Sequence, residues 1–264
     1  MQLHTIESGS GKPVVLLHGF PEFWYSWRKQ IPALAAAGFR AIAPDLRGYN
    51  DSPKPVEIEA YKLTHAIDDV AEVIERAGAP CALVGHDWGG VIAWYVAMSR
   101  PELVDRLAVL NIPHPAPFLR ELRKSTSQKL RMVYQLYFQP PLFAETTMPV
   151  LLPLFLRKAG RFTREEIGEY KQAWKKPGAL RGMANYYRAI RRYRGELKGL
   201  VKRVEVPTLI IWSQGEPVMR PQTLEGTEEW VPHLRIAKIA GAGHFVQTDE
   251  PEIVNEVLID FLSR

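Results

Sequence analysis

Short apolar runs alternate with longer amphipathic segments along most of the chain. Several of the runs are apolar throughout, which is typical of strands buried on both faces of a sheet. The pattern predicts strands at 3–7, 14–18, 40–45, 81–86, 105–111, 207–212 and 235–240. Helical patterns lie between them at 25–37, 61–77, 89–99 and 251–262. Strands alternating with helices predict an α/β protein with a mostly parallel sheet flanked by helices on both faces.

The alternation stops between about Pro115 and Lys202, where no segment has a convincing strand pattern. Helical patterns occur there around 120–139, 163–175 and 179–195. Ligands of open α/β sheets bind outside the carboxyl ends of the strands, so an insertion that leaves a strand end would cover the ligand. We therefore expect a core formed by 1–114 and 203–264, and an all-helical cap formed by 115–202.

The composition is that of a globular protein, with 264 residues of which 46% are hydrophobic and 24% charged. The single cysteine, Cys81, excludes a disulfide within the chain and suits a reducing compartment. The N-terminus has no signal-peptide pattern, and the apolar run at 149–156 is far shorter than the roughly 20 residues of a membrane-spanning helix. We expect a cytoplasmic protein that does not insert into membranes.

Positive charge is concentrated in the predicted cap. Residues 118–203 carry 20 Lys and Arg against 6 Asp and Glu, whereas the rest of the chain carries 14 against 23. Such asymmetry can mark a nucleic-acid or membrane surface. Here the basic segment also has apolar residues at helical spacing, which favours a packed helical insertion with a solvated basic face. Because no nucleic-acid-binding motif is visible, no nucleic-acid partner is expected.

The strongest chemical signal is the segment LVGHDWGGVIAWYVA at 83–97. An apolar strand leads to Asp87, and glycines at 85, 89 and 90 allow a sharp turn into a helix. This is the arrangement of a nucleophile elbow, with aspartate at the position that serine usually occupies. A carboxylate there can attack a carbon atom and form an ester with it. The alternative is an ordinary strand-to-helix turn in which Asp87 caps the helix.

A second signal is the segment VVLLHGFPEFW at 14–24. In hydrolases of this layout, the loop after such a strand gives one N–H group to an oxyanion hole, and the residue after the nucleophile gives the other. The backbone amides of Phe20 and Trp88 are therefore predicted to bind an oxyanion. Because an X-Pro bond in a tight turn can be cis, Phe20–Pro21 is a candidate for that isomer.

The histidine and the acid of a catalytic triad are predicted near the C-terminus. His244 follows a glycine-rich turn in IAGAGHFVQTDEP (239–251), where the hydrolase order of nucleophile, acid and histidine requires the base. Glu216 is the one carboxylate in the loop 213–221 after a strand, and is predicted to orient His244. Asn111 could take that place only as a neutral acceptor. Asp249 and Glu250 are expected to cap the last helix.

With these motifs in place, the chain resembles the α/β-hydrolase-fold epoxide hydrolases. The resemblance covers nearly the whole chain and rests on HGFPE (18–22), DLRGYNDSP (45–53), GHDWGG (85–90), the helical insertion and AGAGH (240–244). It implies seven strands here instead of the usual eight, because the chain begins close to the second strand. Asn50 departs from the family, which commonly has glycine at this position, and Glu216 stands where many relatives have aspartate.

The resemblance also implies two cap tyrosines that hydrogen-bond an epoxide oxygen. Tyr134 lies in VYQLYFQPP (133–141) and Tyr187 in ANYYRAI (184–190), and both segments are similar to the family's tyrosine segments. Tyr137 and Tyr186 are the neighbours with which they could be confused. A tyrosine in a helical pattern often serves packing alone, so the assignment depends on both segments together.

The resulting hypothesis is an epoxide hydrolase that converts an epoxide and water to a vicinal diol through an aspartyl ester, with no cofactor and no metal. The alternative is a haloalkane or haloacetate dehalogenase that uses the same aspartate. Phe20 argues against it, because an asparagine often follows His-Gly in haloalkane dehalogenases. A binding protein without catalytic activity is a further alternative, and a monomer or a homodimer is equally compatible with the sequence.

Overall fold

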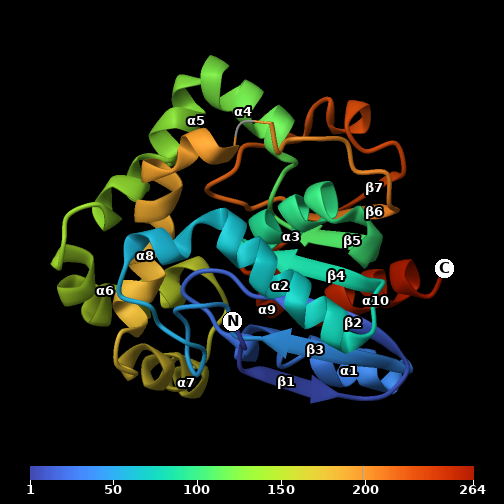
Figure 1. Cartoon of the computed structure of the whole chain (residues 1–264), viewed down its shortest axis with the longest axis horizontal. Helices are drawn as coiled ribbons and strands as arrows, with labels where there is room; N and C mark the ends of the chain where they lie inside the picture. The colour runs from blue at the N-terminus through green and yellow to red at the C-terminus, as the bar shows by residue number, and fades with distance from the viewer. Residues whose placement is uncertain (198) are drawn as a thin grey trace.

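The computed structural model describes residues 1–197 and 199–264 and contains a seven-stranded sheet at its centre (Figure 1). The strand order is β1-β3-β2-β4-β5-β6-β7, and every pairing is parallel except that of β1 with β3. The strands are β1 (Thr5–Ser8), β2 (Lys12–Leu17), β3 (Phe39–Pro44), β4 (Cys81–His86), β5 (Val104–Leu110), β6 (Thr208–Ser213) and β7 (Leu234–Ile239). The predicted α/β fold with seven strands is confirmed.

Helices cover both faces of the sheet, as expected when a strand is apolar on both sides. On one face, α1 (Gln30–Ala36) and α10 (Pro251–Leu262) pack with Val14 and Leu16 of β2. On the other face, α2 (Leu63–Ala77) and α3 (Trp88–Ser99) pack with Val15 and Leu17 of the same strand. Alternating side chains of β2 therefore enter two separate hydrophobic clusters, and the strand is fixed in register from both sides.

All regular elements that the structure describes between the end of β5 and Leu197 are helices. We call this segment, residues 115–197, the helical insertion. It lies over one end of the sheet, on the left and at the top of Figure 1. Its elements are α4 (Pro115–Lys124), α5 (Thr126–Arg131), η4 (Val133–Phe138), α6 (Phe143–Ala159), α7 (Arg164–Lys175), α8 (Ala179–Arg192) and η5 (Arg194–Leu197). Position 198, inside the predicted cap 115–202, lies outside the described residues. The division into a core and a cap stays a prediction.

The connecting segments contain further short helices. They are η1 (Trp24–Trp27), η2 (Ile58–Tyr61), η3 (Pro101–Leu103), η6 (Pro221–Leu224), η7 (Thr227–Glu229) and α9 (Val246–Asp249). The helix predicted at 25–37 is therefore divided into η1 and α1, and the one predicted at 120–139 into three pieces. Local turn geometry decides these divisions, which hydrophobic spacing alone does not reveal.

The helix α6 was absent from the sequence-based prediction. It contains Pro149 and Pro153, and proline inside a helix removes a hydrogen bond and clashes with the preceding turn. Buried Met148, Leu152 and Leu156 nevertheless hold α6 in place, because they occupy one helical face. In the part of the chain that the structure describes, no helix is long and apolar enough to cross a membrane.

The loop after β3 accommodates Asn50 in a backbone conformation that favours glycine. Asn50 has a φ of 36°, and asparagine tolerates positive φ better than most residues. Its side-chain amide donates a 2.8 Å hydrogen bond to the carboxylate of Asp45, which also accepts one from the Trp24 amide at 2.9 Å. The loop is therefore tied to the turn that follows β2, although it departs from the family pattern.

Candidate active site

Asp87 lies at a sharp turn between β4 and α3, at the carboxyl edge of the sheet. Its backbone has a φ of 49° and a ψ of −119°, an unfavourable conformation for a residue with a side chain. It occupies the N-cap position of α3, but its side chain makes no capping hydrogen bond. The carboxylate instead accepts a hydrogen bond from the Phe20 amide, which argues against the simple helix-cap interpretation.

The glycines around Asp87 are needed because backbone segments approach one another closely. A Cβ on Gly85 would overlap the Gly89 carbonyl, and a Cβ on Gly89 would overlap the carbonyl oxygen of Leu17 in β2. A Cβ on Gly19 would collide with the side chain of Asp87. These positions allow the turn after β4 and the loop after β2 to meet at the carboxylate.

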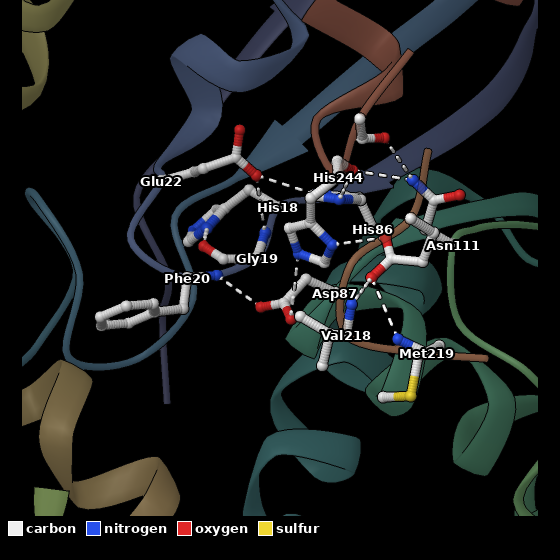
Figure 2. Close-up of polar contacts among 12 residues, drawn as sticks. His18, Gly19, Phe20, Glu22, His86, Asp87, Asn111, Val218, Met219 and His244 are labelled. Atoms are coloured by element: carbon white, nitrogen blue, oxygen red, sulfur yellow. Dashed lines mark hydrogen bonds and ion pairs between the residues drawn. The ribbon is translucent and has the colours of Figure 1, made fainter. Parts of the chain in front are cut away.

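The loop after β2 supplies a hydrogen-bond donor to the nucleophile candidate. The Phe20 amide donates a 2.7 Å hydrogen bond to Oδ1 of Asp87 (Figure 2). The Phe20–Pro21 peptide bond is cis, as the sequence indicated. Trp88 is the first residue of α3, where backbone N–H groups have no partner within the helix. Both predicted oxyanion-hole amides thus belong to residues beside Asp87 in space or in sequence.

His244 lies between two carboxylates. Its Nε2 is 3.6 Å from Oδ2 of Asp87, and its Nδ1 donates a 2.7 Å hydrogen bond to Oε2 of Glu216. The other oxygen of Glu216 accepts hydrogen bonds from the amides of Val218 (2.7 Å) and Met219 (3.1 Å), which Figure 2 also shows. The structure therefore brings Asp87, His244 and Glu216 into one continuous row, with Glu216 fixed by backbone donors.

The charges in this row change one another's pKa. Burial by itself would lower the pKa of His244, but the carboxylates of Glu216 and Asp87 outweigh it and raise that pKa well above its ordinary value. Burial would likewise raise the pKa of Asp87 and of Glu216, yet the hydrogen bond and charge of His244 hold both values below their ordinary range. The imidazolium with two carboxylates is therefore the stable protonation state.

Asn111 does not contact the imidazole ring, so it does not replace Glu216. Its Oδ1 accepts a 2.7 Å hydrogen bond from the Ser213 amide, and its Nδ2 donates to the carbonyl oxygens of Gly243 (3.2 Å) and His244 (2.8 Å). Asn111 has a φ of 58°. It joins the ends of β5 and β6 to the His244 turn, and so holds the backbone of His244.

The expectation that Asp249 and Glu250 cap the last helix is wrong. Glu250 is the N-cap residue of α10 but makes no side-chain capping bond, and its carboxylate pairs with Arg161 at 2.8 Å. Asp249 accepts 2.8 Å hydrogen bonds from the amides of Gly243 and Arg161. These contacts tie the His244 turn to the segment between α6 and α7, because the donors that the two carboxylates bind belong to Gly243 and Arg161 and not to α10.

A buried histidine–glutamate pair lies behind His244 and was missed by the sequence analysis. His86 Nδ1 is 2.9 Å from Oε2 of Glu22, and His86 Nε2 is 2.9 Å from the backbone oxygen of His244. Both side chains are fully buried. Glu22 also accepts hydrogen bonds from Ser26 (2.5 Å) and Gln247 (3.3 Å). The acidic residue in HGFPE is a signal that could have identified this pair.

Tyr134 of η4 and Tyr187 of α8 approach each other with ring centroids 6.0 Å apart. Tyr187 is buried and stacks on Phe138 at 4.0 Å, with its edge toward Phe20 at 5.3 Å and Trp88 at 5.3 Å. Burial, the other tyrosine and the charge of Asp87 raise the pKa of Tyr187 well above its ordinary value. Its hydroxyl is therefore a neutral hydrogen-bond donor next to both oxyanion-hole residues.

Tyr134 has 39% of its surface exposed, yet burial of its hydroxyl end and the charge of Asp87 raise its pKa as well. The two tyrosines that could be confused with this pair are placed differently. Tyr137 hydrogen-bonds to Thr147 at 2.5 Å. Tyr186 packs against Tyr49 and Tyr61, and its buried hydroxyl has no partner among the described residues. The charge of Asp87 contributes to the raised pKa of both Tyr134 and Tyr187, as it does to that of Tyr49.

One group of side chains has the spacing of metal ligands. Atoms of His4, Asp45 and Asp51 lie within 4.8 Å of one another. Asp45 already accepts hydrogen bonds from His4 (2.7 Å) and Asn50 (2.8 Å). These internal bonds account for the group, and we assign no metal to it.

Comparison with known proteins places this chain in a family. A model of the alpha/beta hydrolase fold matches residues 12–251. The chain is 38% identical to AB hydrolase superfamily protein YfhM of Bacillus subtilis, over 99% of this chain and 94% of that protein. It is 37% identical to human epoxide hydrolase 4, over 100% of this chain and 76% of the relative.

A solved structure agrees with these matches. The epoxide hydrolase of Bacillus megaterium, crystallised with an inhibitor, superposes with a TM-score of 0.88 at 34% identity, covering 99% of this chain and 97% of that one. The fold and the elbow define an α/β hydrolase. Within that class, the chain belongs to the epoxide hydrolase family.

The charge row predicts a pH-dependent contribution to stability. Because the pKa of His244 is raised, its stabilisation is complete below about pH 6.5 and is lost as the pH rises through the raised value. The lowered carboxyl pKa values act oppositely, and their contribution is lost as the pH falls through them. The melting-temperature difference between wild type and His244→Gln should therefore be largest near pH 5 to 6.5 and shrink toward alkaline pH. A difference independent of pH would contradict the charged row.

Proposed function

We propose that the protein hydrolyses an apolar epoxide to a vicinal diol, with Asp87 as the nucleophile. The strongest support comes from the surroundings of the Asp87 carboxylate. It accepts a hydrogen bond from the Phe20 amide and lies 3.6 Å from the His244 imidazole. Its charge also contributes to the raised pKa values of Tyr134 and Tyr187. A nucleophile, a base with its orienting acid and two neutral donors are the groups that ring opening and ester hydrolysis require.

In the first step, an oxygen of Asp87 attacks one carbon of the epoxide ring. The carbon–oxygen bond on the opposite side breaks, and a glycol ester of Asp87 forms. The Tyr134 and Tyr187 hydroxyls donate hydrogen bonds to the departing oxygen, where negative charge develops. Because both tyrosines keep raised pKa values, they remain protonated donors at neutral pH.

Ester formation changes the protonation of His244. The Asp87 charge, one of the two carboxylates that raise the pKa of His244, disappears when the ester forms. The imidazolium then loses its proton to solvent, and the departing epoxide oxygen gains a solvent proton through the tyrosine hydroxyls. The first step thus converts His244 from an acid into a neutral base.

In the second step, His244 deprotonates a water molecule that attacks the carbonyl carbon of the ester. The amides of Phe20 and Trp88 stabilise the oxyanion, and Glu216 stabilises the imidazolium. The glycol oxygen leaves with one proton of the water. His244 keeps the other, and the Asp87 carboxylate returns to its resting charge. All atoms and charges of the free enzyme are therefore restored.

Replacement of His244 should stop the second step and leave the first. In His244→Gln, we expect the epoxide to accumulate as an adduct on Asp87, seen by intact-protein mass spectrometry as an increase equal to the epoxide mass. Asp87→Asn/His244→Gln is the matched control and should show no adduct. Retained turnover in His244→Gln without an adduct would remove His244 from this role.

The tyrosine pair should determine the rate of ester formation. Tyr134→Phe or Tyr187→Phe should each lower the single-turnover alkylation rate, by about 10²-fold, and the double variant should be nearly inactive. Tyr186→Phe is the matched control, because its hydroxyl has no partner to lose. Loss of activity in Tyr186→Phe alone would mean that the epoxide oxygen binds elsewhere.

The reaction class is tested by incubating the protein with styrene oxide and, separately, with a bromoalkane. We expect diol from the epoxide, no halide from the bromoalkane, and loss of the diol in Asp87→Ala. Halide without diol would replace the proposal by dehalogenation. Neither product on a wider set of epoxides would leave only a binding function.

A further inference from the structure

Exposed hydrophobic side chains are concentrated on the helical insertion. Eleven of the fifteen large hydrophobic residues exposed in the described part of the chain lie between Leu119 and Phe155. We define the apolar insertion face as the exposed residues of η4, of the following turn and of α6: Val133, Leu136, Leu142, Phe143, Val150, Leu151, Leu154 and Phe155. Since scattered exposed hydrophobics are normal but clusters mark interaction sites, this face needs a partner.

The face combines a protruding turn with one side of a helix. Leu142 is 72% exposed in a left-handed conformation with a φ of 62°, and Phe143 beside it is 51% exposed. Val150 and Leu154 follow at helical spacing on α6, with 68% and 56% exposure. The opposite side of α6, with Met148, Leu152 and Leu156, is buried, so α6 is apolar on its outer side as well as on its buried side.

The stretch of chain that contains this face carries an excess of positive charge. Residues 119–158 contain seven basic and two acidic side chains. Both acids are neutralised from outside the stretch, Glu121 by Arg220 and Glu145 by Arg188. Among the described residues, none of the seven basic side chains forms an ion pair; they are Arg120, Arg123, Lys124, Lys129, Arg131, Arg157 and Lys158. Arg120 and Arg131 donate to the backbone oxygens of Glu225 and Pro217. The partner surface should therefore be both apolar and negatively charged.

The face is continuous with the walls of the active site. Phe155 contacts Phe245 with ring centroids 5.9 Å apart, and Phe245 lies 5.2 Å from the ring of His244. On the other side, η4 carries Val133 and Leu136 next to Tyr134, which faces Tyr187. A surface that binds the apolar insertion face would therefore lie next to the residues that surround the catalytic side chains.

We propose that the apolar insertion face docks the protein on an anionic lipid surface. Phe143 and the outer side of α6 enter the boundary between headgroups and acyl chains, while Arg157, Lys158 and the basic residues of α4 and α5 contact lipid phosphates. A second copy of the chain fits less well, because two basic surfaces would meet. If the proposed function holds, docking places the catalytic row beside the phase in which apolar epoxides dissolve.

The test is co-sedimentation of the whole protein with vesicles of phosphatidylcholine, with or without phosphatidylglycerol. We expect binding only when phosphatidylglycerol is present, and weaker binding at high salt. Val150→Glu/Leu154→Glu should abolish it, and Arg157→Gln/Lys158→Gln should weaken it by about 30-fold. Ile253→Glu is the matched control, because Ile253 is 44% exposed on α10, which covers one face of the sheet and does not belong to the apolar insertion face.

Vesicle binding does not depend on turnover, so a failure of the proposed function and a failure of docking are distinguishable. Diol formation from a water-soluble epoxide should be unchanged in Val150→Glu/Leu154→Glu, which checks that this variant folds. Absence of binding by the folded wild type, or equal binding by this variant, would overturn the proposal. A change from dimer to monomer in the same variant, seen by analytical ultracentrifugation, would identify the face as a self-interface and also overturn it.

Discussion

The buried negative charge of Asp87 is the constraint on which the rest of the site depends. An isolated carboxylate is costly to bury, and here the Phe20 amide and the His244 imidazolium compensate for it. The compensation is arranged from the ends of β2, β4, β6 and β7, which a mostly parallel sheet brings to one edge. Glu216 and Asn111 then fix the side chain and the backbone of His244, so that each contact around Asp87 is held by another.

In the proposed mechanism, the same charge explains how His244 changes from a cation to a base within one turnover. The row is stable with a cationic His244 only while both carboxylates are charged. An ester on Asp87 would remove one of these two charges. His244 would then lose its proton and become a base next to the ester that water must attack. The helical insertion adds Tyr134 and Tyr187, whose pKa values are raised in part by the Asp87 charge. Both hydroxyls therefore stay protonated and do not neutralise the carboxylate.

Local patterns predicted much of this arrangement. The strands and the three motifs around Phe20, Asp87 and His244 are short segments whose apolar runs and glycines are visible in sequence. Contacts between distant segments were not predictable in this way, as with Glu22 and His86, which are 64 residues apart. Asp249 was assigned to the nearest helix end, although its partners are Gly243 and Arg161. Helix α6 was missed because its two prolines oppose a helix that tertiary packing stabilises.

The central claim is that water attacks Asp87 and not the epoxide. A single turnover with enzyme in excess, run in water enriched in heavy oxygen, tests it most directly. We predict that the diol of this first turnover contains no heavy oxygen and that the label is found in the Asp87 carboxylate after proteolysis and mass spectrometry. Heavy oxygen in the first diol, with none in Asp87, would contradict the ester intermediate.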